Sequence, residues 1–175
     1  EVIEAMANRF AKLASPGILG ARLINTDGSL QTSCVQALPT AINQALDSEF
    51  LRRLFPNSRL WGVSALWSAS EPVEVEAVSG ACMMMKRASF AKVGGFSSDY
   101  FMYGEDMDLC HKVRVSGQSI YYDPLTEIIH HGGGSSKGAG SEFSSVMMRE
   151  SIHRFLRRNQ GAFSAMAYRA AMLKI

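Results

Sequence analysis

Three carboxylates stand close together at Glu105, Asp106 and Asp108. They fall in the first turn of a helix that the apolar spacing predicts over residues 104–115. Carboxylates at such a place accept free backbone N–H groups and suit the positive end of the helix dipole, which is a purely structural use. The alternative is that one of them is a general base facing a cleft, with residues 101–104 forming an apolar lip around it.

A second group of residues that could do chemistry is the pair His130 and His131, which precedes a glycine-rich run. A histidine at the end of a strand can bind a metal or a phosphate. Neighbouring residues of a strand point to opposite faces, so only one of the two can line a given site. A hydrogen-bonded structural histidine is the other interpretation. Ser79 and Gly80 form a third group, where the glycine indicates either close backbone approach or tight packing.

The elements that must position these residues alternate between strands and helices. Helices are predicted over 2–13, from Thr40 to before Pro56, over 86–93 and 104–115, and from near Glu142. Strands are predicted over 18–24, 30–35, 71–76 and 78–85, and over 119–122 and 126–130 with Asp123-Pro124 splitting the last two. A turn over 25–29 and loops over 57–70 and 132–140 connect them. This alternation is typical of an α/β fold.

Several side chains are expected in the core. Helical spacing indicates that Leu109, Cys110 and Val113 point inward, and that Ile42, Leu46, Phe50 and Leu54 form one apolar side. The apolar run 78–85 suits a strand covered on both faces. Trp61 and Trp67 are interpreted as a hydrophobic lid, with ligand stacking as the alternative.

The composition excludes several classes of protein. Of the 175 residues, 47% are hydrophobic, which is enough for a packed core and argues against global disorder. The net charge of +2 argues against a protein that coats nucleic acid. Three widely spaced cysteines form no disulfide framework and fit a reducing compartment. We find no membrane span and no signal peptide in the sequence, and the start at Glu1 is interpreted as that of a piece of a longer protein.

A series of motifs appears in one order along the chain. Gly17-Ile18-Leu19-Gly20 and Asp27-Gly28-Ser29-Leu30-Gln31 come first, then Val78-Ser79-Gly80-Ala81-Cys82-Met83, Lys86-Arg87 and Val93-Gly94-Gly95-Phe96. They are followed by Phe101-Met102-Tyr103-Gly104-Glu105-Asp106-Met107-Asp108-Leu109-Cys110, Gly117, Tyr121-Tyr122, Pro124 and His130-His131-Gly132-Gly133-Gly134-Ser135-Ser136. This order resembles the C-terminal half of a family 2 glycosyltransferase, closest to the rhamnosyltransferase-like enzymes of bacterial cell-surface polysaccharides.

The resemblance implies a partial GT-A fold, with a mixed sheet flanked by helices, and an inverting sugar transfer from a nucleotide-diphosphate sugar. By matching position, Asp106 is the implied catalytic base and Glu105 its support or an acceptor contact. Ser79, Gly80, Tyr103 and Asp108 are the implied substrate-binding residues. His130 is the implied contact to a divalent cation, Mg²⁺ or Mn²⁺, with His131 as the other candidate.

The sequence also departs from the family. The N-terminal nucleotide-binding half, with its Asp-x-Asp metal motif, is missing, and Asp106-Met107-Asp108 matches the base segment instead. After Gly-Gly-Phe the usual carboxylate is replaced by Ser97 and Ser98, with Asp99 next. We therefore expect residues 1–160 to be the acceptor and catalytic-base half, and 161–175 a C-terminal tail. This chain alone is expected to be inactive.

Two alternatives remain open. One is a non-catalytic module that self-associates as a homodimer. The other is a metal-dependent hydrolase using Asp106, Asp108 and His130, which predicts that these three cluster around a metal.

The C-terminal segment suggests a further partner. From Ser141 onward six basic residues stand against two acidic ones, and residues 162–175 are mostly apolar or small. Such a segment can lie on an anionic membrane surface, which suits an enzyme acting on lipid-linked glycans in the cytoplasm. A helix that packs on the domain with a solvated charged face is the alternative.

Overall fold

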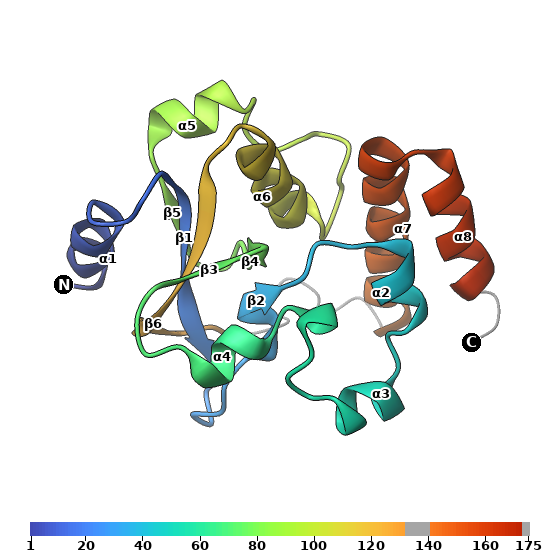
Figure 1. Cartoon of the computed structure of the whole chain (residues 1–175), viewed down its shortest axis with the longest axis horizontal. Helices are drawn as coiled ribbons and strands as arrows, with labels where there is room; N and C mark the ends of the chain where they lie inside the picture. Colours follow the sequence, from blue (N-terminus) through green and yellow to red (C-terminus); the bar gives the residue numbers. More distant parts are fainter. Residues whose placement is uncertain (132–140, 173–175) are drawn as a thin grey trace.

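A computed structural model describes residues 1–131 and 141–172, and its centre is a four-stranded mixed sheet (Figure 1). Strand β1 (Pro16–Ile24) pairs in parallel with β6 (Ser119–Ile129) and antiparallel with β5 (Met83–Met85), and β3 (Val73–Val75) joins the free edge of β6. A second sheet consists of β2 (Val35–Gln36) and β4 (Ala77–Val78). The fold is α/β, as predicted; the missing nucleotide-binding half stays a prediction.

Helices cover both faces of the sheet. Alternate side chains of β1 point to opposite faces, so β1 contributes to the core on each side. On one face Leu19 and Ala21 pack against α1 (Val2–Phe10), through Met6 and Phe10. On the other face Ile18 packs in the main core with α6 (Glu105–Val115), as Figure 1 shows. The predicted inward residues of α6 are confirmed, since Leu109, Cys110 and Val113 are all buried.

Two helices at the C-terminal end form a separate layer beside α6 (Figure 1). Helix α7 (Ser141–Gln160) turns at Gly161, which has φ +89°, into α8 (Ala162–Met172). Leu156 of α7 packs against Ala165 and Tyr168 of α8, and Phe155 of α7 meets the ring of His111 of α6 edge-on at 5.4 Å. The proposed division at residue 160 therefore falls at a helix–helix turn, and it stays a prediction.

The predicted helix after Thr40 is wrong in extent. It is two short helices, α2 (Ala41–Ala45) and α3 (Glu49–Leu54), because Thr40 caps the first and the Ser48 side chain accepts a hydrogen bond from Leu51 N–H to cap the second. The break also turns the expected core stripe outward. Its four members are 40–70% exposed: Ile42, Leu46, Phe50 and Leu54.

Other short elements correct the predicted strands. Residues 30–35 form one bridge, Leu30 to Ile24, then a 3₁₀ turn over Thr32–Cys34 that leads into β2. The run 78–85 is broken between β4 and β5, so it is not one covered strand. The predicted loop 57–70 contains a 3₁₀ turn at Arg59–Trp61 and α4 (Ser64–Ser68); Trp61 is buried, as a lid residue should be, and Trp67 is 57% exposed. Helix α5 (Arg87–Lys92) lies where a helix was predicted.

Asp123 explains why β6 is one strand with a bulge rather than two strands. Its carboxylate accepts hydrogen bonds from Thr126 Oγ1 at 2.5 Å and Leu125 N–H at 3.0 Å, and it pairs with Arg9 at 3.1 Å. The pairing with β1 consequently jumps from Ala21–Asp123 to Arg22–Glu127. The predicted loop 132–140 lies outside the described residues. Within the described part of the chain, no helix is long and apolar enough to cross a bilayer.

Candidate active site at the start of helix α6

Asp106 and Gly80 meet where α6 begins. Asp106 Oδ2 accepts a hydrogen bond from the Gly80 N–H at 3.0 Å, and Oδ1 accepts one from the Met107 N–H at 2.8 Å. Together these two donors fix the orientation of a partly exposed carboxylate. The structure therefore brings together Asp106 and Gly80, two residues that lie 26 positions apart in the sequence.

The turn that carries Gly80 is held by one hydrogen bond to the 3₁₀ turn at Thr32–Cys34 and by one from α6. The Ser79 N–H donates to the Cys34 carbonyl at 3.1 Å, and the Cys110 thiol of α6 lies 3.8 Å from the Val78 carbonyl. Burial raises the pKa of Cys110 to about 12, so this thiol is structural rather than nucleophilic. A Cβ on Gly80 would lie 3.3 Å from the Asp106 Cβ, which is why a glycine suits this position.

Two residues with positive φ precede the helix. Gly104, the N-cap of α6, has φ +82°, and Tyr103 has φ +64°. The left-handed region is unfavourable for a tyrosine, and such strain is concentrated at functional sites. A Cβ on Gly104 would meet Ser151 of α7 at 3.0 Å, so the turn passes closely beneath α7. The partly exposed Tyr103 therefore sits next to the three carboxylates, in the lip that the sequence predicts.

Glu105 presents an unusual atom. Its Oε2 is buried and has no hydrogen-bond partner among residues 1–131 and 141–172. A buried carboxylate oxygen is ordinarily satisfied, so one without a partner among the described residues has room for a further hydrogen-bond donor. This feature suits the predicted acceptor contact of Glu105.

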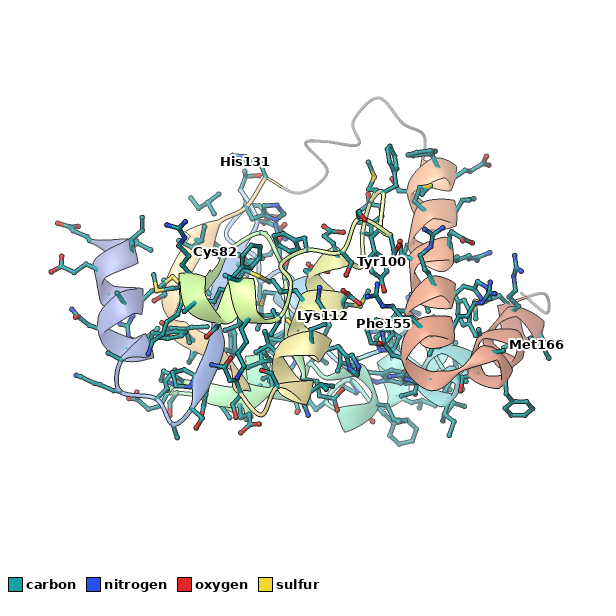
Figure 2. The ribbon with its side chains drawn as sticks, turned by 90° about the horizontal axis from the view of Figure 1, so that it is seen from above. Cys82, Tyr100, Lys112, His131, Phe155 and Met166 are labelled. Carbon is teal, nitrogen blue, oxygen red and sulfur yellow. The ribbon has the colours of Figure 1, made fainter. Side chains whose placement is uncertain are left out.

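Asp108 has a different environment from its two neighbours. It is 1% exposed, pairs with Lys112 at 3.2 Å and accepts hydrogen bonds from Ser97 Oγ at 2.6 Å and Tyr100 OH at 3.3 Å. Burial, together with the Asp108 charge, raises the pKa of Tyr100 well above its usual range. Figure 2 shows Tyr100 between α6, which carries Lys112, and α7. Asp108 thus holds the 97–100 loop on α6, and its predicted substrate contact stays a prediction.

His130 is held in a defined orientation at the end of β6. The Gln31 amide donates from Nε2 to the His130 carbonyl at 2.6 Å and to Asn25 Oδ1 at 2.7 Å, so its Oε1, 2.9 Å from His130 Nδ1, is the acceptor. His130 Nδ1 is therefore the donor in this contact. In the neutral ring, Nε2 is then the nitrogen that could bind a metal. This is the arrangement that orients metal-binding histidines. His131 is exposed, at the edge of the molecule in Figure 2.

The residues proposed for a hydrolase do not gather around one point. No group of three metal-ligating side chains occurs in the described ranges, and Asp108 is committed to Lys112 and Ser97. The cluster that would favour a hydrolase is therefore not found there, and His130 is the one predicted metal contact whose surroundings fit that task.

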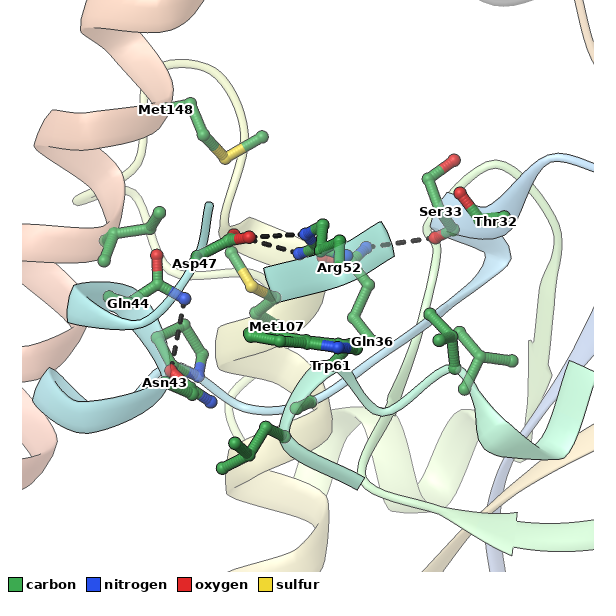
Figure 3. A pocket seen from close by; sticks show the side chains of 16 residues that line it. Thr32, Ser33, Gln36, Asn43, Gln44, Asp47, Arg52, Trp61, Met107 and Met148 are labelled. Atoms are coloured by element: carbon green, nitrogen blue, oxygen red, sulfur yellow. Dashed lines mark hydrogen bonds and ion pairs between the residues drawn. The ribbon is translucent and has the colours of Figure 1, made fainter. Parts of the chain in front are cut away.

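A cavity of about 300 Å³ lies beside α6 and was not predicted (Figure 3). Met107 lines it from α6, and Met148 from α7. On its other side the Arg52 guanidinium pairs with Asp47 and lies 5.0 Å from the ring centre of Trp61. The lining side chains come from six separate segments, so no local pattern in the sequence indicates the cavity. Trp61, for which ligand stacking was an alternative, is the one lining residue that the sequence itself singles out for a ligand contact.

Comparison with known proteins finds similarity to enzymes of sugar transfer. Residues 63–131, which contain Gly80, Asp106 and His130, match a family described as the N-terminal domain of galactosyltransferase. An N-acetylglucosaminyl-diphospho-decaprenol L-rhamnosyltransferase of Mycobacterium tuberculosis is 32% identical over 131 residues, which are 74% of this chain and 42% of the relative. The rhamnosyltransferase WbbL of Escherichia coli is 37% identical over 57 residues, 33% of this chain and 22% of the relative.

The chain spans less than half the length of these curated relatives. Both are rhamnosyltransferases by name, and the matched family is also one of sugar transfer. The comparisons therefore confirm the resemblance to rhamnosyltransferase-like glycosyltransferases that the order of the motifs predicts.

Proposed function

We propose that the protein is an inverting family 2 glycosyltransferase with Asp106 as its catalytic base. The observation that carries this proposal is the Asp106–Gly80 contact, which fixes a partly exposed carboxylate at the helix start. The preceding residue in the sequence, Glu105, has a buried Oε2 without a hydrogen-bond partner among the described residues. A fixed carboxylate can accept the proton of an acceptor hydroxyl as that oxygen attacks. Glu105 would accept a hydrogen bond from the acceptor and orient it.

The proposed reaction transfers a sugar from a nucleotide-diphosphate sugar to that hydroxyl. The acceptor oxygen bonds to the anomeric carbon on the face opposite the diphosphate, the bond to the diphosphate breaks, and the proton moves to Asp106. Inversion follows because attack and departure take place on opposite faces. Ser79, Gly80 and Tyr103 would border the acceptor.

His130 would hold a divalent cation, Mg²⁺ or Mn²⁺, through Nε2, since the contact of Nδ1 with Gln31 fixes the ring as in metal-binding histidines. When bound, such a cation stabilises the negative charge of a leaving diphosphate. Further metal ligands and the nucleotide-binding groups are expected in the half of the relatives that this chain does not match.

The names of the relatives suggest the substrates. We infer a rhamnosyl donor and a lipid-linked glycan acceptor carrying a diphosphate, in bacterial cell-envelope polysaccharide synthesis. A lipid-linked acceptor would place the protein at the inner face of the plasma membrane, in the cytoplasm.

The test is transfer by the full-length protein, followed as release of nucleoside diphosphate from a panel of nucleotide-sugars including rhamnosyl donors. Asp106→Asn should lower kcat by a factor of about 10²–10⁴ and leave the melting temperature almost unchanged. Glu74→Gln, an exposed carboxylate on β3, is the matched control and should keep full activity. Near-normal turnover by Asp106→Asn would disprove the assignment of the base.

One observation favours the non-catalytic alternative, a module that forms homodimers. Four apolar side chains of α2, its C-cap and α3 are 40–70% exposed, and Trp67 of α4 is 57% exposed. Exposed apolar side chains in such number are typical of protein–protein contact surfaces. Sedimentation equilibrium should then show a dimer that Phe50→Ser/Leu54→Ser dissociates. A monomer at all concentrations would exclude this alternative.

A further inference from the structure

Four arginines converge on one cleft at the C-terminal end of the molecule. The cleft, of about 670 Å³, lies between α7, α8 and the loop at Asp99. Arg154, Arg157 and Arg158 come from α7, and Arg169 comes from α8. None of the three carboxylates of α6 lines this cleft, and the proposed transfer reaction does not use it.

Only part of this positive charge is neutralised by the protein. Arg154 pairs with Glu150 at 3.2 Å, and Arg158 pairs with Asp99. Arg157 and Arg169 form no ion pair or hydrogen bond with any residue that the structure describes. Like charges that are gathered without partners repel one another, so an anion in the cleft would relieve the repulsion.

An apolar groove adjoins the arginine cleft. It has a volume of about 490 Å³ and shares Glu150, His153 and Arg169 with the cleft, while Tyr168 and Met172 of α8 line its apolar part. His153 Nδ1, on the shared wall, is buried and has no hydrogen-bond partner in the described chain. A ligand that joins a phosphate to a hydrocarbon chain would fit this pair of sites.

The outer stripe of α8 adds exposed apolar side chains. Phe163 is 82% exposed, Met166 is 63% exposed, and Arg169 follows at the same three-residue spacing. Figure 2 shows Met166 at the end of the molecule farthest from α1. Exposed aromatic and apolar residues beside arginines are typical of helices that lie in a membrane interface.

We propose that the cleft binds the phosphate headgroups of anionic lipids, with Phe163 and Met166 entering the bilayer surface. Arg157 and Arg169 would be the principal phosphate contacts because no described residue of the protein pairs with them. The inference rests on this charge and exposure alone and does not depend on the transferase activity.

The test is co-sedimentation of the full-length protein with vesicles of phosphatidylcholine, with and without phosphatidylglycerol. We expect binding only when phosphatidylglycerol is present. Arg157→Gln/Arg169→Gln should weaken it by about tenfold or more. The matched control is Arg87→Gln/Lys92→Gln, which removes the same charge from exposed positions on α5 and should bind within about twofold of the unchanged protein.

A second pair of variants separates lipid from a soluble phosphate ligand. Phe163→Ser/Met166→Ser should weaken vesicle binding but leave any thermal stabilisation by pyrophosphate unchanged. Stabilisation by pyrophosphate without vesicle binding would overturn the lipid assignment. The cleft would be excluded as the binding site if the α5 control lost as much vesicle binding as Arg157→Gln/Arg169→Gln. Equal binding of the unchanged protein to both vesicle types would exclude it too.

Discussion

Asp106 Oδ2 lies 3.0 Å from the backbone nitrogen of Gly80, and this one hydrogen bond joins the start of α6 to the turn that follows β4. The position of the proposed base therefore depends on the shape of a turn in another part of the sequence. Substitutions in that turn should change catalysis through the orientation of Asp106, without removing any reacting group.

Gly80→Ala tests this dependence. The added Cβ would approach the Asp106 Cβ to 3.3 Å, so the carboxylate must shift by a few tenths of an ångström. We expect kcat/KM of the full-length protein to fall about tenfold, because small misplacements of a reacting group are costly. The free energy of unfolding should change by less than about 1 kcal/mol, since Gly80 is exposed and needs no positive φ. Ala81→Ser, which adds one atom in the same turn, should keep its activity; an unchanged kcat/KM for Gly80→Ala would contradict the coupling.

The helix that carries Asp106 could be predicted because its signals are local. Apolar spacing placed Leu109, Cys110 and Val113, and Gly104 marked its start. The structure of residues 40–55 could not be predicted in the same way, because periodicity continues through Ser48 while the Ser48 side chain caps a new helix. Local capping there outweighs an apolar pattern that finds no core to cover.

Long-range contacts account for the remaining differences. The cavity beside Met107 depends on Arg52, Asp47 and Trp61, whose contacts follow from the path of the chain and from no repeated spacing. The two aspartates of α6 are a second example, because Asp106 and Asp108 lie in the same helix turn and cannot be told apart by local sequence. Only the tertiary contacts with Ser97 and Tyr100 show that Asp108 is buried while Asp106 stays accessible.

A comparison of two ion pairs tests the structural role of Asp108. Asp108–Lys112 and Glu150–Arg154 have the same four-residue spacing and the same 3.2 Å separation, but Asp108 is 1% exposed and the second pair is more than 40% exposed. Asp108→Asn should lower the free energy of unfolding by about 3 kcal/mol, because it leaves a buried network without its charge. Glu150→Gln should lower it by less than about 0.5 kcal/mol. Urea unfolding measures the free energy of unfolding of both variants. Similar decreases for the two variants would show that burial does not determine how much each ion pair contributes to stability.

Tyr103 offers a test of backbone strain at the site. Tyr103→Asn and Tyr103→Val both remove the ring, but asparagine tolerates a φ of +64° and a β-branched valine does not. The valine variant should therefore be less stable than the asparagine variant by about 1–2 kcal/mol. The same two substitutions at Ser98, which has no positive φ, should differ much less in urea unfolding. If the valine variant at position 103 is as stable as the asparagine variant, the turn has relaxed and the positive φ is not required.

His111 predicts a pH dependence of stability. It lies against Phe155, and its pKa is lowered by burial first, with Asp108 raising it and Arg114 lowering it. The unfolded histidine binds a proton near pH 6.5, while the folded one binds it only at lower pH. The contribution of His111 to the free energy of unfolding is therefore fully present above about pH 6.5. It is lost as the pH falls toward the lowered pKa that His111 has in the folded protein.

His111→Gln should remove that loss. Between about pH 7.5 and about pH 5.5 the free energy of unfolding, measured with urea, should fall more in the unchanged protein than in the variant. The carboxylates titrate in both proteins, so their contributions cancel in the difference. His131→Gln changes an exposed histidine and should keep the pH dependence of the unchanged protein. Equal slopes for the unchanged protein and His111→Gln would show that the burial of the His111 ring between α6 and α7 does not control its protonation.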